Sequence, residues 1–251
     1  MSATADLRAL HVPGDPLVLP NAWDAATARL VQEAGFPVVA TTSSGVAEAL
    51  GYADREVTPV EEMLAAVARI ARAVAVPVTA DLEGGYGLEP AELAERAAAA
   101  DAAGLNFEDT DHAGFPALHA VDAQAERIAA LKAAGDLVVN ARIDAVIRGG
   151  DLEEALARAA AYRDAGADCV YPIGVTDEGH IARFVALGVP VNILLAPEAP
   201  PVSRLRALGV ARVSLGEYVY ADAMDFVRER LLALRPGGGD APAADASAAS
   251  S

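Results

Sequence analysis

Short apolar runs alternate with longer helical segments along most of this 251-residue chain. The recurring unit is a helix that ends at glycine and is followed directly by an apolar strand. Glycine accepts the left-handed backbone that closes a helix, so each instance marks a junction from helix to strand. The unit recurs at residues 35–37, 104–106, 135–137, 166–168, 188–190 and 209–211, and two further apolar strands lie at 17–20 and 76–81. The pattern therefore predicts eight strands.

The segments between the strands carry helix start signals. Residues 58–61 read Thr-Pro-Val-Glu, a capping box with proline at the first helical position. Asp151 opens a helix over 152–165, and Pro90 opens another. Strands that alternate with helices form a parallel sheet, and eight similar units favour a closed (β/α)₈ TIM-type barrel over a doubly wound sheet.

Length and composition limit the domain organisation. A chain of 251 residues suffices for one α/β barrel and is short for two large domains. We expect residues 1–235 to form the barrel. The Gly-, Pro-, Ala- and Ser-rich segment 236–251 is typical of a disordered tail.

The charge balance narrows the range of partners. A net charge of −17 disfavours nucleic acids and anionic membranes, and no apolar run approaches the length of a membrane span. The single cysteine, Cys169, excludes an internal disulfide and fits a reducing compartment, so we predict a cytoplasmic protein that binds a small molecule. Cys169 lies inside an apolar strand, which favours a packed core position over a nucleophile.

Polar residues mark the carboxyl ends of the predicted strands, where barrel enzymes carry their active sites. Acids dominate one side of this rim, and Arg142 faces them. In strand order the residues are Asn21, the segment 41–44, Asp81 with Glu83, Glu108 with Asp109, Asn140 with Arg142, Tyr171, Asn192 and Ser214.

Several carboxylates in one concave space repel one another unless a cation neutralises them. Oxygen ligands of this kind select Mg²⁺ or Mn²⁺, and Mg²⁺ takes one or two direct carboxylates while keeping several waters. We predict Asp81 as the direct ligand, with Glu83 and Glu108 holding metal-bound waters. The alternative is that each acid is a strand-end residue paired with an arginine.

The loops at this rim have two interpretations each. Thr42, Ser43 and Ser44 offer hydroxyls and N–H groups to a substrate carboxylate, or form a plain polar turn. Residues 84–87 (Gly-Gly-Tyr-Gly) lack a phosphate-binding spacing and indicate a flexible loop. His112 and His119 follow strand four, where a solvated or lid histidine is expected rather than a ligand. Trp23 either walls the pocket or packs under the first helix.

Together these residues resemble the isocitrate lyase and phosphoenolpyruvate mutase superfamily over about residues 17–234. The motifs that carry the resemblance are Asn-Ala-Trp-Asp at 21–24, Gly-Tyr-Ala-Asp at 51–54, Asp-Leu-Glu-Gly-Gly-Tyr-Gly at 81–87, Asn-Phe-Glu-Asp at 106–109, Asn-Ala-Arg at 140–142 and Asn-Ile-Leu at 192–194. Each motif is weak alone, and the combination is specific.

The resemblance assigns roles to single residues. Asp54, Asp81, Glu83 and Glu108 match the family's acidic metal shell, with glutamate at 83 where aspartate is usual. Residues 42–44 match the segment that binds the substrate's carboxylate, and Trp23 and Asn192 complete our candidate substrate-binding set. Arg142 matches the arginine that stabilises an oxyanion. We therefore take Arg142, Asp54 and Glu108 as the candidate catalytic residues.

The loop after strand four departs from the family pattern. Isocitrate and methylisocitrate lyases carry a Lys-Lys/Arg-Cys-Gly-His motif there, whereas residues 109–119 contain neither lysine nor cysteine. The sequence therefore names neither the proton donor nor the substrate.

The leading prediction is a Mg²⁺-dependent lyase that cleaves a C–C bond, or less readily a P–C bond, of a small 2-oxo or 2-hydroxy carboxylate through an enolate-like species. The alternatives are a phosphoenolpyruvate or phosphonopyruvate phosphomutase and a catalytically silent metabolite-binding barrel. By resemblance the protein is expected to form a homotetramer that exchanges C-terminal helices, here residues 221–234.

Overall fold

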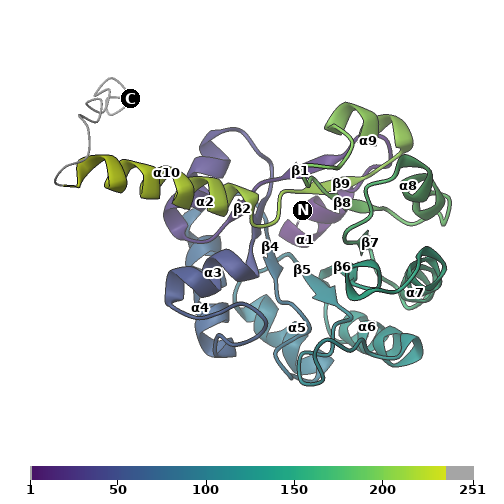
Figure 1. The fold of residues 1–251 in the computed structure, drawn as a ribbon. Coiled ribbons are helices and arrows are strands. Elements are labelled where there is room, and N and C mark those ends of the chain that lie inside the picture. Colours follow the sequence, from purple (N-terminus) through teal and green to yellow (C-terminus); the bar gives the residue numbers. More distant parts are fainter. Residues whose placement is uncertain (1, 236–251) are drawn as a thin grey trace.

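The computed structural model describes residues 2–235, so the predicted disordered tail lies outside the described residues. Helices surround a ring of short parallel strands (Figure 1). The strands are β1 Leu17–Leu19, β2 Asn21–Ala22, β3 Val39–Thr41, β4 Val78–Asp81, β5 Gly104–Glu108, β6 Val138–Ile143, β7 Cys169–Pro172, β8 Asn192–Leu194 and β9 Arg212–Ser214. The helices are α1 Ala3–Ala9, α2 Ala25–Glu33, α3 Ser43–Leu50, α4 Val60–Ala73, α5 Pro90–Ala99, α6 Val121–Ala134, the 3₁₀ turn η1 Val146–Arg148, α7 Leu152–Asp164, α8 Glu178–Val185, α9 Val202–Leu208 and α10 Tyr218–Leu234.

The strands form a ring in chain order. β2 to β7 are hydrogen-bonded in sequence as parallel neighbours, and β8, β9 and β1 form a second parallel group. The chain itself joins the two groups at Pro20, and a parallel bridge between Val170 and Val191 joins β7 to the start of β8. The predicted barrel is therefore confirmed. Its first strand is divided into β1 and β2 because Pro20 has no N–H to donate to a neighbour.

An apolar cluster closes the amino-terminal end of the barrel. Helix α1, which the sequence pattern did not predict, carries the fully buried Leu7 into this cluster. Its neighbours there lie in strands β1, β3 and β6 or directly before β3 and β5; they are Leu17, Leu19, Val38, Ala40, Ala103 and Val138. Figure 1 shows α1 lying across the ring of strands. The carboxyl end of the barrel is left for a polar site.

The glycine junctions are confirmed at four of the six positions, with φ of 88° at Gly35, 96° at Gly166, 77° at Gly188 and 90° at Gly209. The prediction is wrong at the other two. Gly135 is extended, with φ of −166°. Gly104 lies inside β5, where a Cβ would come within 2.5 Å of the Val138 carbonyl oxygen. Close strand spacing, rather than a left-handed turn, therefore accounts for that glycine.

The helix start signals are also partly confirmed. Asp151 caps α7, because its carboxylate accepts a hydrogen bond from Glu154 N at 2.8 Å. Pro90 is the first residue of α5. The capping box at residues 58–61 is wrong: α4 begins after Pro59, and the Thr58 hydroxyl is buried without a hydrogen-bond partner among the described residues.

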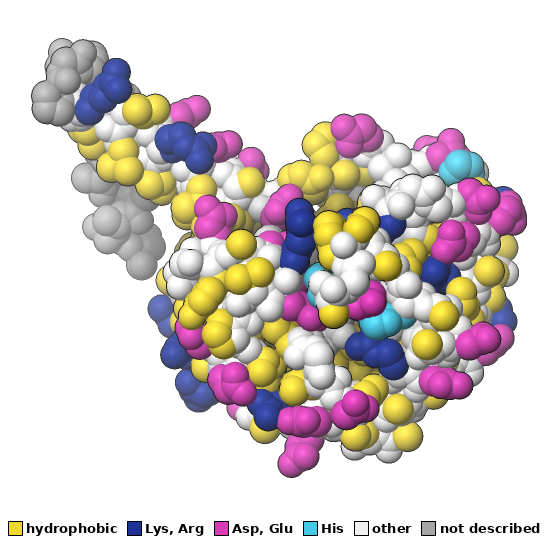
Figure 2. Space-filling model, turned by 60° about the horizontal axis from the view of Figure 1, so that its bottom comes forward, with side chains coloured by type: hydrophobic (Ala, Val, Ile, Leu, Met, Phe, Trp, Pro, Cys, Tyr) yellow, Lys and Arg dark blue, Asp and Glu magenta, His cyan; other side chains and the backbone are white. Residues whose placement is uncertain are grey.

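The last helix leaves the barrel surface. Figure 1 shows α10 extending sideways from the ring, and Figure 2 shows hydrophobic side chains along this arm. Five of its large apolar side chains are exposed: Phe226, Val227, Leu231, Leu232 and Leu234. Within residues 2–235 no helix is both long and apolar enough to cross a membrane.

Candidate active site

A cavity of about 200 Å³ opens at the carboxyl ends of the strands. Its wall includes six of the residues proposed from the sequence: Thr42, Ser43, Ser44, Asp54, Asp81 and Arg142. Further lining residues are Asn21, Asn106, Tyr171, Ile173, Leu194, Ser214, Gly216, Glu217 and Tyr218. The structure thus brings residues from most of the strand ends around one small polar space.

Asp81 ends β4 and is held from two sides. Its Oδ2 accepts hydrogen bonds from the backbone N and the hydroxyl of Ser43, at 3.2 and 2.9 Å. Its Oδ1 accepts from the side-chain amide of Asn106 at 3.2 Å. These neutral donors orient the carboxylate without neutralising it, because none of them carries a charge. Asp81 therefore presents an oriented negative charge to the cavity.

Glu83 lies beside the cavity but does not line it. Its carboxylate accepts hydrogen bonds from the Glu56 N–H at 3.0 Å and the Tyr86 hydroxyl at 2.6 Å. Burial, together with the charges of Asp54 and Asp81, raises the pKa of Glu83 to about 8 against the opposing hydrogen bond from Tyr86. At neutral pH the carboxyl group is thus largely protonated, unless a cation lies nearby.

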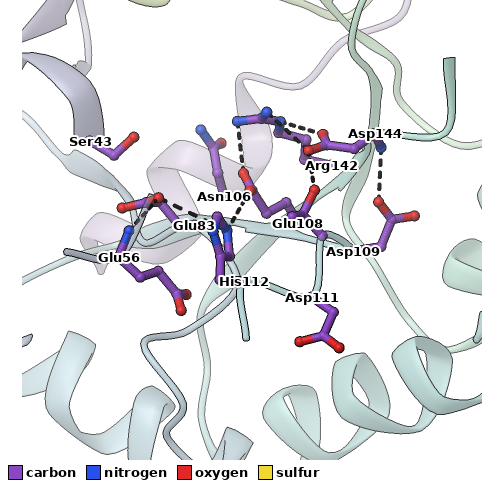
Figure 3. A network of polar contacts seen from close by, with 12 residues as sticks. Ser43, Glu56, Glu83, Asn106, Glu108, Asp109, Asp111, His112, Arg142 and Asp144 are labelled. Atoms are coloured by element: carbon purple, nitrogen blue, oxygen red, sulfur yellow. Dashed lines mark hydrogen bonds and ion pairs between the residues drawn. The ribbon is translucent and has the colours of Figure 1, made fainter. Parts of the chain in front are cut away.

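Glu108 and His112 form a buried pair, visible in Figure 3. His112 Nε2 lies 2.8 Å from Glu108 Oε1 and 4.0 Å from Glu83 Oε2. The His112 side chain is 8% exposed, so the expected solvated or lid histidine is wrong. Burial lowers the pKa of His112, but the hydrogen bond and charge of Glu108 outweigh burial, so the pKa lies above its ordinary value. His119 is partly exposed, as expected.

Arg142 is the cation of the cavity wall, and two carboxylates hold it in place (Figure 3). Asp144 receives hydrogen bonds from Nε at 2.7 Å and Nη2 at 3.1 Å, and Nη1 lies 2.7 Å from Glu108 Oε2. These contacts leave the remaining N–H groups of the guanidinium for another oxygen. Burial opposes the charge, yet Glu108, Asp144 and Asp81 raise the pKa of Arg142 well above its ordinary value.

The segment Thr42–Ser44 is the N-terminus of α3. Thr42 is the N-cap residue, and its side chain makes no capping hydrogen bond because its hydroxyl lies 3.0 Å from that of Ser44. The first N–H groups of an α-helix have no intrahelical partner and attract anions. The Ser43 N–H and hydroxyl donate to Asp81, and the Thr42 N–H donates to the Ala22 carbonyl at 3.2 Å. The hydroxyls of Thr42 and Ser44 and the positive end of the helix dipole therefore face an anion in the cavity.

Two substrate-binding candidates from the sequence lie away from the cavity wall. Trp23 packs edge-on against Tyr220 of α10, with ring centroids 5.0 Å apart. Asn192 is fully buried and donates to the Ser214 hydroxyl at 3.0 Å, so it supports a lining residue from below. Cys169 is fully buried, and burial raises its thiol pKa to about 12, which agrees with the predicted core position.

The donor set fits a hard divalent cation held by few direct ligands. Among residues 2–235 no group of three or more His, Cys, Asp or Glu side chains is arranged to hold a metal by itself. Asp81 alone among the three predicted metal residues lines the cavity. Burial is the main cause that raises the pKa of Asp54, Glu83 and Glu108, and the charge of Asp81 adds to it; a bound cation would relieve that repulsion. One direct carboxylate with water-mediated neighbours matches this geometry.

Sequence reasoning missed several residues of the site. Asp144 was overlooked although it lies two positions after Arg142 at the end of β6, on the same side of the chain. Asn106 lies two positions before Glu108 in β5, and the same alternation would have found it. Glu56 and Tyr86 carry no such signal, because they lie in loops and approach Glu83 only in the folded chain.

Comparisons with known proteins identify the family. A family model described as phosphoenolpyruvate phosphomutase matches residues 7–235. The oxaloacetate decarboxylase of Bradyrhizobium sp. strain ORS 278 is 32% identical over 232 residues, which cover 86% of this chain and 80% of the relative. The 2-methylisocitrate lyase of Salmonella typhimurium is 32% identical over 206 residues, which cover 72% of this chain and 70% of the relative.

Solved structures share the fold over nearly the whole chain. A candidate phosphonomutase from Burkholderia cenocepacia J2315 superposes with a TM-score of 0.85 at 39% identity, covering 91% of this chain and 98% of the other. A phosphonopyruvate hydrolase, solved with oxalate and Mg²⁺, superposes with a TM-score of 0.83 at 26% identity, covering 95% and 89%. With the family model spanning the barrel and relatives above 30% identity, this chain belongs to the isocitrate lyase/phosphoenolpyruvate mutase superfamily of enzymes.

Proposed function

We propose that this protein is a Mg²⁺- or Mn²⁺-dependent lyase that cleaves a C–C bond of a small 2-oxo or 2-hydroxy carboxylate through an enolate-like intermediate. The observation that carries the proposal is the cavity wall, which gathers Arg142, Asp81 and the N-terminus of α3 around about 200 Å³. Pockets for drug-sized ligands are larger, on the order of 300 to 1,000 Å³. The space therefore suits a small acid.

Residues of this chain would contact both ends of such a substrate. The hydroxyls of Thr42 and Ser44, at the N-terminus of α3, bind its carboxylate. When the C–C bond breaks, the departing carbon forms a new C=O bond from its own alkoxide or carboxylate oxygen and leaves as a carbonyl compound or CO₂. The electron pair of the broken bond moves through the other carbon onto the adjacent carbonyl oxygen, where Arg142 donates hydrogen bonds to the developing charge. Glu108 and Asp144 fix Arg142 before the reaction begins. Asp54 completes the catalytic set at the cavity wall.

A divalent metal would be held directly by Asp81 and through waters by Glu83 and Glu108. When bound, it would supply a Lewis acid that neutralises negative charge on the substrate's oxygens. The phosphonopyruvate hydrolase complex, in which oxalate and Mg²⁺ occur together, supports this choice.

Calorimetric titration with oxalate tests the proposal, because oxalate resembles enolpyruvate in its planarity and its two adjacent chelating oxygens. We expect tight oxalate binding with Mg²⁺ or Mn²⁺ and weaker binding of pyruvate under the same conditions. Equal oxalate affinity in EDTA, or no binding in either condition, would contradict the enolate reading. Screening a panel of 2-oxo and 2-hydroxy diacids with Mg²⁺ then identifies the bond that is cleaved.

The rival phosphomutase needs a cation for the phosphoryl group near His112 or Arg148. Arg148 instead stacks over the Phe115 ring at 4.6 Å, and His112 is bound to Glu108. Among the described residues that line the cavity, Arg142 alone carries a basic side chain. C–C cleavage is therefore favoured, and ³¹P NMR with phosphonopyruvate separates the two reactions. Metal-dependent oxalate binding without turnover of any acid would favour a silent barrel.

Two further proposals concern the oligomeric state and the cellular compartment. We propose a homotetramer in which α10 packs on a second copy, because exposed Phe226 and Leu231 need a cover and α10 begins at the cavity wall with Tyr218. Light scattering on the Phe226→Glu/Leu231→Glu double variant tests this, and an unchanged mass would contradict it. The buried single thiol of Cys169 fits the cytoplasm that we propose as the compartment.

A further inference from the structure

Arg212 is a buried cation without an ion-pair partner in the part of the chain that the structure describes. It lies in β9 inside the barrel and is 1% exposed. No described carboxylate within residues 2–235 approaches it to 4.0 Å, and its Nη1 has no hydrogen-bond partner there. Buried charges are normally paired because leaving water is costly. An unpaired guanidinium in this position therefore needs a reason beyond packing.

The guanidinium lies under the floor of the cavity and contacts two of its lining residues. Arg212 Nη2 donates to Asn106 Oδ1 at 3.2 Å, and Arg212 Nε donates to the Ser214 hydroxyl at 3.3 Å. Asn106 and Ser214 line the cavity, whereas Arg212 does not. Arg212 therefore acts on the site only through these neighbours and through its charge.

The contact with Asn106 determines which end of that amide faces the site. Asn106 Oδ1 accepts from Arg212 Nη2 and also from Asn140 Nδ2 at 2.8 Å. The other end of the amide, Nδ2, donates to Asp81 Oδ1 at 3.2 Å. A rotated amide would place its NH₂ group against two donors and its oxygen against the Asp81 carboxylate. Arg212 thus favours the orientation in which Asn106 donates to Asp81.

We propose that Arg212 is a positioning residue of the active site: it fixes the donor end of Asn106 on Asp81 and places a positive charge beneath the substrate. This inference rests on the proposed function for the identity of the metal and the anion. Burial lowers the pKa of Arg212, while Cys169, Tyr171 and Asp81 raise it. A guanidinium remains protonated at neutral pH, so the charge is permanent.

The two effects predict opposite shifts for the two kinds of ligand. Replacing Arg212 removes its positive charge and its hydrogen bond to Asn106. Asp81 then attracts a cation more strongly, so metal binding tightens. The same change removes attraction for an anion, so oxalate binding weakens. A purely structural arginine would lower stability and weaken both ligands together. The sign of the two shifts therefore separates the roles.

The experiment measures Mn²⁺ affinity by electron paramagnetic resonance and oxalate affinity by calorimetry at saturating Mn²⁺. In Arg212→Met we expect the Mn²⁺ Kd to fall by about threefold and the oxalate Kd to rise by about tenfold. Arg212→Gln, which keeps one amide donor, should shift both in the same directions if the methionine variant does not fold. Arg212→Lys keeps the charge and should restore most of the oxalate affinity.

The matched control is Leu17→Ala, because Leu17 pairs with Arg212 across the β1–β9 ladder and packs in the apolar cluster around Leu7. It should lower Tm and leave both affinities unchanged. Weakening of both ligands, or no change in either, in Arg212→Met would overturn the inference. If the wild type binds no Mn²⁺, the proposed function fails, and crystal structures then decide the inference. A rotated Asn106 amide in Arg212→Met supports it, and an unchanged Asn106–Asp81 hydrogen bond overturns it.

Discussion

The two ends of the barrel are built in opposite ways. At the amino end, α1 places Leu7 in an apolar cluster of strand residues. At the carboxyl end, Glu83 and Glu108 are buried near one another with raised pKa values, and four non-glycine residues there, Arg55, Glu56, Glu83 and Tyr86, have positive φ. Positive φ and the burial of neighbouring acids both cost stability. The amino end thus stabilises a fold whose other end is arranged for binding and catalysis.

The sharpest test of this contrast is Asp81→Ala. Activity should be abolished, because the variant removes the proposed direct metal ligand. Tm should stay unchanged or rise, because one acid leaves a crowded cluster. Turnover with Mg²⁺ and thermal unfolding of the same preparation measure the two effects. Unchanged turnover would exclude the metal assignment.

The opposite change at the amino end is Leu7→Ala. Removing a fully buried leucine should lower the free energy of unfolding by about 2 to 5 kcal/mol. Turnover at a temperature where the variant is folded should match the wild type. Leu30→Ala is the control, since Leu30 is 62% exposed and should cost little in urea unfolding. Equal losses of unfolding free energy in the two variants would contradict the stabilising role of α1 at the amino-terminal end of the barrel.

Acid stability should report on the amino end through His11. Burial, together with the charge of Arg212, lowers the pKa of His11 to about 4, against about 6.5 in the unfolded chain. Its contribution is present above pH 6.5 and is lost as pH falls towards 4, by about 3 kcal/mol. In His11→Asn, whose amide replaces the 2.9 Å contact to the Leu7 carbonyl, unfolding in urea should depend less on pH between 4 and 6.5. If the unfolding free energies of the wild type and His11→Asn changed with pH in the same way, the prediction would be wrong.

Arg142→Lys tests the carboxyl end without removing its charge. Lysine lacks the planar set of donors that meets Asp144, Glu108 and a substrate oxygen together, so kcat should fall by at least roughly tenfold. Arg183→Lys is the control, because Arg183 pairs with Glu153 on the exposed surface. A wild-type kcat in Arg142→Lys would leave Arg142 a structural role only.

The smallest effect is expected for Cys169→Ala. The thiol lies in the strand core, so its loss should cost on the order of 1 kcal/mol and leave turnover nearly unchanged. Inactivation of a folded variant would show that this cysteine takes part in the reaction.

The barrel and the location of its site follow from local sequence features. Apolar runs that alternate with helices produce parallel strands, and a closed parallel ring brings their carboxyl ends to one rim. Asp81 and Arg142 could be found in this way because each stands at the end of its own strand. The helix-closing glycines Gly166 and Gly209 were equally local, since a left-handed turn depends on the residue itself.

Tertiary structure decided which polar residue of a strand reaches the cavity. Asn140 lies two residues before Arg142 on the same face of β6, about 6.6 Å deeper in the barrel, and Asn192 likewise lies below Ser214. Depth depends on strand tilt and register, which a single strand does not encode. The burial of His112 and the isolation of Arg212 depend in the same way on segments far apart in the chain. The local sequence thus determines which residues are charged. The packing of the whole barrel determines how deeply each charged side chain is buried and which groups it contacts.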